Sequence, residues 1–165
     1  MLALRYVYLI ALVIWLGGMV VLGAIIAPAT FQVLQAGAPD IGRALAGELF
    51  GVILSRFQYV AYAAGAVLFV TLAVMALLGP RPSGFAIRMA IIAVMIAVAL
   101  YAGFSVLGEI DDIQRAAGTL PSKLTAGDPR RLRFDQLHQL STWLMTFNIV
   151  AALALLYWEA KEHVR

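Results

Sequence analysis

The chain has 165 residues, of which 63% are apolar and only 13% are charged, with 12 Lys and Arg against nine Asp and Glu. A soluble domain carries about 25% charged residues, and a chain this short has too little interior to bury so much apolar surface. The mean hydropathy of +0.92 agrees. The composition therefore argues against a water-soluble domain and predicts a membrane protein, organised as one domain over residues 1–165.

Charged residues are absent from four long stretches of the chain. No charge lies between Arg5 and Asp40, between Arg56 and Arg81, between Arg88 and Glu109, or between Asp135 and Glu159. A helix that crosses the hydrocarbon core needs about 20 mostly apolar residues, and a spanning backbone must pair its polar groups within the segment. The gaps therefore predict an all-α integral membrane four-helix bundle, with spans at about 4–27, 57–79, 86–107 and 139–158.

The first long loop, at about 28–56, carries a helical pattern of its own. Pro39 and Asp40 form a helix start, with Asp40 as the cap. Apolar residues then recur at helical spacing, which predicts an amphipathic helix at the membrane interface or against the bundle. They are Ile41, Leu45, Leu49, Val52 and Ile53.

The fourth helix is predicted to be long and to protrude from the membrane. Asp128 followed by Pro129 is a strong helix start, and no Pro or Gly follows to the end of the chain. A helix from Pro129 to about Glu162 would be roughly 50 Å long, which exceeds the hydrocarbon core by about 20 Å. Trp143 and Trp158 are placed to mark the two interfacial belts of the bilayer.

The basic and cysteine-free composition excludes several kinds of site and partner. With no cysteine, disulfides, thiolate zinc sites and iron–sulfur clusters are excluded. His138 and His163 are the only histidines, too few for the four axial ligands of a two-haem bundle, and no cofactor is predicted. The pI near 9.5 favours contact with anionic lipid head groups over nucleic acid.

The distribution of basic residues predicts the orientation in the membrane. Four spans place both termini on one side, together with the short loop from Gly79 to Ile87. That side has the denser basic residues close to helix ends, which the positive-inside rule weighs most. They are Arg5, Arg81, Arg88, Lys161 and Arg165. The other side carries more basic residues in total, balanced by acidic ones, over two longer segments. We therefore expect cytoplasmic termini.

Polar residues gather at the level of the membrane away from the termini. Span four carries Phe134, His138, Ser141, Met145 and Asn148 at helical spacing on one face. Antiparallel packing predicts a polar cluster at one level, formed by Arg56, Gln58, Ser105, Glu109, Asp112, His138 and Ser141, with Gln32 nearby. Buried polar groups in a membrane are costly and often functional.

Two interpretations of this cluster stay open. One is a hydrogen-bonded clamp that ties the helix ends to the loops, in which Asn148 bonds across helices. The other is a ligand or ion site, in which His138 ligates a metal together with Glu109 or Asp112. No Walker loop, HExxH or GxSxG motif occurs in the chain.

Two motifs resemble the transmembrane protein 205-like family of four-span membrane domains. The first is Trp15, Gly17 and Gly18 followed by Pro28, and the second is the row Phe134, His138, Ser141 and Asn148. The first motif also resembles the copper resistance protein D family. Relatives often carry a histidine in the first helix where this chain has Tyr8, and this departure from the resemblance argues against copper or haem ligation here.

The resemblance implies a bacterial inner-membrane protein linked to metal or xenobiotic resistance. Together with the residues, it predicts a non-enzymatic protein that acts as an accessory subunit of a larger complex, as a homo-oligomer, or in resistance. Transport or binding of a small ion or metal through the cluster around His138 is the alternative. A third possibility is a membrane enzyme that uses His138 as its base.

Overall fold

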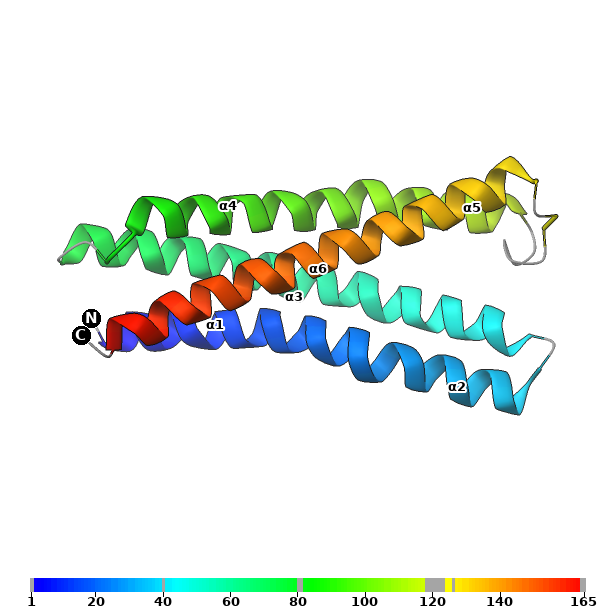
Figure 1. The fold of residues 1–165 in the computed structure, drawn as a ribbon, viewed down its shortest axis with the longest axis horizontal. Coiled ribbons are helices and arrows are strands. Elements are labelled where there is room, and N and C mark those ends of the chain that lie inside the picture. The colour runs from blue at the N-terminus through cyan, green and yellow to red at the C-terminus, as the bar shows by residue number, and fades with distance from the viewer. Residues whose placement is uncertain (1, 40, 80–81, 118–123, 126, 164–165) are drawn as a thin grey trace.

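Four long helices run side by side along the length of the molecule (Figure 1). The computed structural model describes residues 2–39, 41–79, 82–117, 124–125 and 127–163, and this part of the chain contains helices and turns only. Each of the four is long and apolar enough to cross a membrane. The predicted all-α bundle is confirmed, and the chain is an integral membrane protein.

Two of the four helices contain a π-helical turn. The first runs without a break through α1 (Leu2–Val21), the π-turn η1 (Leu22–Ile26) and α2 (Ala27–Gly37), and the third through α4 (Phe85–Tyr101), the π-turn η2 (Ala102–Val106) and α5 (Leu107–Ala117). The second is the single helix α3 (Gly42–Leu78) and the fourth is α6 (Pro129–His163). Such turns are rare and carry one extra residue within an otherwise regular helix.

The helices are much longer than a bilayer requires. The 37-residue α3 is about 55 Å long at 1.5 Å per residue, whereas the hydrocarbon core is about 30 Å thick. Its charge-free part begins after Arg56, so the segment from Gly42 to Arg56 extends beyond the membrane. The protrusion predicted for the fourth helix is therefore shared by the second.

The prediction of a first loop at 28–56 is wrong in one respect. The amphipathic helix exists, but it is the first part of α3 and is continuous with span two, while α2 carries span one past Pro28 to Gly37. The π-turn η1 explains the continuity. Its wider turn, in which Ala27 N–H reaches the Leu22 carbonyl, relieves the clash between the ring of Pro28 and the carbonyl four residues earlier. Asp40, the expected cap, lies outside the described residues.

The core lies between α1 and its neighbours and contains large apolar side chains beside small ones. Trp15 is fully buried, and a Cβ added at Gly65 of α3 would stand 3.1 Å from its ring. A Cβ at Gly18 would collide with the ring of Phe57, whereas Gly17 faces open space. The Trp-x-Gly-Gly motif therefore serves close approach of α1 and α3, as small residues do in membrane bundles.

The helices change partners along the length of the bundle (Figure 1). Both termini lie at the same end, and α6 crosses the bundle obliquely, from α5 to α1 (Figure 1). In the described part of the chain α6 packs on α1, α4 and α5, while α2 packs on α3. The α2–α3 pair and the α5–α6 pair separate toward the end opposite the termini (Figure 1).

Candidate functional site

The residues of the predicted polar cluster differ widely in exposure. Arg56, Asp112, His138, Gln32 and Ser105 are exposed, Gln58, Glu109 and Ser141 are partly buried, and Asn148 is buried. The oblique path of α6 explains the difference along its polar row (Figure 1). Because α6 crosses the bundle, a face that starts outside at His138 ends inside at Asn148.

The carboxylates predicted as metal ligands are engaged by arginines. Arg133 of α6 donates to both carboxylate oxygens of Glu109 of α5, at 2.6 and 2.9 Å, and Arg115 donates to Asp112 at 3.3 Å. The ring of His138 stacks on Phe134 with centroids 6.3 Å apart. Within the described ranges, no group of three His, Asp or Glu side chains could hold a metal ion. The geometry therefore supports the clamp between α5 and α6 over the metal site.

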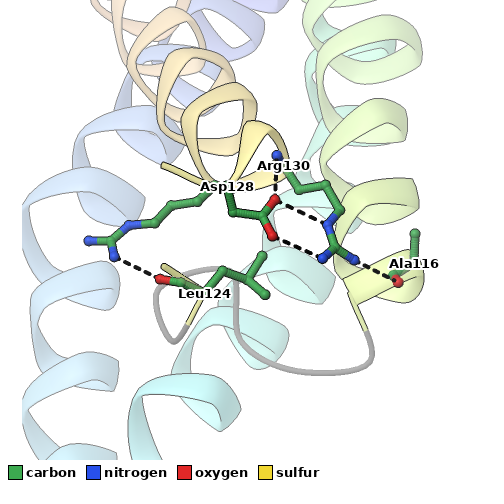
Figure 2. A network of polar contacts seen from close by, with 5 residues as sticks. Ala116, Leu124, Asp128 and Arg130 are labelled. Atoms are coloured by element: carbon green, nitrogen blue, oxygen red, sulfur yellow. Dashed lines mark hydrogen bonds and ion pairs between the residues drawn. The ribbon is translucent and has the colours of Figure 1, made fainter. Parts of the chain in front are cut away.

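A second part of this clamp forms at the start of α6, where the predicted Asp128 cap is present (Figure 2). The carboxylate of Asp128 accepts the main-chain N–H of Arg130 at 2.9 Å and also its guanidinium at 2.9 Å. These hydrogen bonds, the side-chain ones foremost, hold the pKa of the Asp128 carboxyl below its usual range. Arg130 also reaches the Ala116 carbonyl, and Arg131 donates to the Leu124 carbonyl at 2.9 Å. Arg130 and Arg131 thus tie both α5 and the segment before α6 to the start of α6.

Asn148 stands apart from this clamp in the middle of the membrane. Its side chain is 5% exposed, and its Oδ1 accepts no hydrogen bond from any described residue. One turn earlier on α6, the methyl group of Met145 stands 3.0 Å from where a Cβ at Gly23 would lie, so α6 approaches the π-turn η1 closely at this depth. The predicted hydrogen bond from Asn148 across helices is not formed by Oδ1 within the described residues.

The most deeply buried charges lie at the opposite end of the bundle, beside the termini. Arg88 of α4 donates to Glu159 of α6 at 2.6 Å, and their side chains are 1% and 2% exposed. Arg5 of α1 places its Nε 3.9 Å from the second carboxylate oxygen of Glu159. The guanidinium of Arg88 also lies over the ring of Tyr8, 5.1 Å from its centroid. Three helices therefore meet at one ion pair, which we call the terminal-end ion pair.

The helix dipoles do not favour these charges. Arg88 lies near the N-terminus of α4 and Glu159 near the C-terminus of α6, and each end of a helix attracts the opposite sign. The two side chains therefore depend on each other. Sequence reasoning counted both only as charges at the ends of spans. The signal that points to a pair is an Arg and a Glu set about one turn inside the ends of neighbouring helices at the same level.

Comparison with known proteins yields one family. The family described as a domain of unknown function (DUF4149) matches residues 10–119, which include α2 to α5 and most of α1 but none of α6. No curated protein and no solved structure matches the chain. The matched range contains Trp15 and Arg88 but ends before His138 and Glu159.

Proposed function

The chain belongs to the DUF4149 family of domains of unknown function, and we propose that it is a non-enzymatic accessory subunit that holds another membrane protein against its first helical hairpin. The observation that carries this proposal is a row of exposed apolar side chains where α3 extends beyond the membrane. We call this row the apolar stripe, and it consists of Ile41, Leu45, Leu49 and Val52, each 42–55% exposed.

Without a partner, the apolar stripe would be exposed to water. Its spacing of four, four and three residues places all four side chains on one face of the helix. The charged residues Arg43, Glu48 and Arg56 of the same segment are also exposed, which indicates that the segment lies outside the hydrocarbon. Glu48 and Arg56 lie beside the stripe on the same face of the helix, three residues after Leu45 and four after Val52. Apolar side chains gathered on a surface in water mark interaction sites.

The chemistry of the partner follows from the continuation of the stripe. Farther along α3, Tyr59 is 73% exposed and Val70 is 56% exposed, within the part of the helix that crosses the membrane. A partner that covers this whole face of α3 is therefore a transmembrane helix whose apolar surface continues beyond the bilayer. Packing between such helices rests on close van der Waals contact.

The test uses the fact that the chain has no cysteine, so that a single introduced one is unique. Leu49→Cys, labelled with a photo-crosslinker in native membranes, is expected to give one product of fixed mass. Gln136→Cys on exposed α6 serves as the control and is expected to give none. Adding Leu45→Asp should remove the product, because a charge then faces the partner.

Two results would contradict the accessory role. Adducts to lipid alone would mean that no protein covers the stripe, and a product of twice the chain mass would replace the role with self-assembly. A separate Arg43→Cys variant, exposed on the face of α3 away from the stripe, tests the proposed placement in a bacterial inner membrane with cytoplasmic termini. It should then react with an impermeant maleimide in intact cells, and reaction only after lysis would reverse the orientation.

Metal or xenobiotic resistance, or transport of a small ion, is a second proposed function. It is supported by the resemblance of the row from Phe134 to Asn148 to the transmembrane protein 205-like family and by the exposure of His138, which leaves its ring accessible. If His138 takes part, His138→Ala is expected to lower the metal content of purified protein or the resistance of cells, with Gln139→Ala as the control. Unchanged values would exclude this role.

A further inference from the structure

An open groove lies between α4 and α6 in the membrane-spanning part of the bundle. Its volume is about 540 Å³, and all the residues that line it are apolar. Small side chains form much of both walls, with Ala86 and Ala90 on α4 and Ala151 and Ala154 on α6, while Val94 and Phe147 lie at the far end. Because alanine leaves space between two packed helices, the chain's own side chains do not fill the groove.

The length of the groove indicates what fills it. The helices are antiparallel, so Ala86 and Ala154 lie toward the termini and Val94 and Phe147 lie toward the middle of the membrane. From Ala86 to Val94 the helix rises about 12 Å, close to half of a hydrocarbon core about 30 Å thick. A transmembrane helix would need a groove through both leaflets. A groove confined to one leaflet fits an acyl chain.

The end of the groove beside the termini carries the residues that a lipid head group would meet. Lys161 follows Ala154 by seven residues on α6, which places it on the same face two turns nearer the membrane surface, and it is exposed. Trp158 lies between Ala154 and Lys161 on α6 and packs on Gly84, the residue before α4. Gly84 has a φ of +62°, which glycine adopts readily. Tryptophan and lysine at this level are typical anchors at the interface.

We propose that this groove binds one acyl chain of an anionic phospholipid from the leaflet on the side of the termini, with the Lys161 ammonium at its phosphate. The apolar walls accept the hydrocarbon, and the lysine supplies the charge complementary to the head group. The site is separate from the apolar stripe, so it does not depend on the proposed partner.

Native mass spectrometry of the full chain, reconstituted with equal phosphatidylglycerol and phosphatidylcholine, tests the proposal. Wild-type protein is expected to retain phosphatidylglycerol in preference to phosphatidylcholine. Ala90→Phe should abolish retention by filling the groove, whereas Ala63→Phe, at an exposed position of α3, should leave it unchanged. Lys161→Gln should reduce the preference for phosphatidylglycerol about fivefold, and Lys161→Arg should restore it.

The opposite results overturn the proposal. Retention by Ala90→Phe equal to that of wild type would show that the groove holds no lipid, and an unchanged preference in Lys161→Gln would remove the head-group assignment. A dimer that Ala90→Phe converts into monomer would make the groove an interface between copies. Circular dichroism checks that each variant is folded. If Ala90→Phe does not fold, Ala154→Leu fills the groove from the opposite wall instead.

Discussion

Glu159→Leu alone is expected to lower the free energy of unfolding by about 3–5 kcal/mol, because it leaves the Arg88 guanidinium buried without its carboxylate. Arg88→Met alone should lower it by less, since Arg5 still lies 3.9 Å from the Glu159 carboxylate. Arg88 is 1% exposed, and Glu159 is 2% exposed, so water cannot replace the lost partner. The double variant is expected to be close to wild type, since a buried pair replaced by apolar residues of similar volume often costs nothing. Equilibrium unfolding in mixed micelles of dodecyl sulfate and a mild detergent measures all three.

The exposed pair of Glu109 and Arg133 provides the control for this prediction. Its side chains are 43% and 52% exposed, and water screens an exposed ion pair so that it contributes little to stability. Glu109→Gln should therefore change the free energy of unfolding far less than Glu159→Leu. If the double variant at positions 88 and 159 were as unstable as the single variants, desolvated charge would not be the cause of their instability.

The terminal-end ion pair links helices at only one end of the bundle. It joins α1, α4 and α6 where the termini lie, and Tyr8 provides a ring beneath the guanidinium of Arg88. At the other end the α2–α3 and α5–α6 pairs diverge (Figure 1). The apolar stripe lies in the α2–α3 pair, away from the α5–α6 pair. This arrangement supports the accessory role.

The fold could be predicted from the sequence because a membrane leaves a strong and local signal. The absence of charge over about 20 residues identifies a span without any knowledge of its neighbours, and Asp128 before Pro129 identifies the start of α6. The continuity through Pro28 could not be predicted in this way, because a π-turn depends on packing against adjacent helices. Composition does not reveal such packing.

The candidate site was harder to predict because it depends on which side chains meet. A regular helical face placed His138 and Asn148 together, but the crossing of α6 leaves the first exposed and the second buried. Glu109 could be placed at the right level, yet its partner is Arg133 of the protruding part of α6. Arg88 and Glu159 are 71 residues apart in the chain, and only the tertiary structure joins them.

Gly42→Ala is expected to destabilise the corner between α2 and α3. Gly47→Ala, on the same helix, is expected to stabilise α3. A Cβ at Gly42 would collide with the main-chain carbonyl of Leu34 and would stand 2.9 Å from the Cα of Gln35. Main-chain atoms of α2 cannot rotate away as a side chain could, so α2 and α3 must move apart. Overpacking of this kind typically costs about 1–3 kcal/mol.

Gly47 provides a matched control because it lies in α3 with no atom within 4 Å of an added Cβ. Alanine there should gain about 0.5–1 kcal/mol, since glycine loses more conformational freedom than alanine when a helix forms. Unfolding in mixed micelles and hydrogen exchange of the amides in α2 and the first half of α3 measure both effects. Because the corner positions the apolar stripe, Gly42→Ala should also weaken crosslinking through Leu49→Cys, and Gly47→Ala should not. Equal effects of the two substitutions would show that α2 and α3 do not depend on close contact at Gly42.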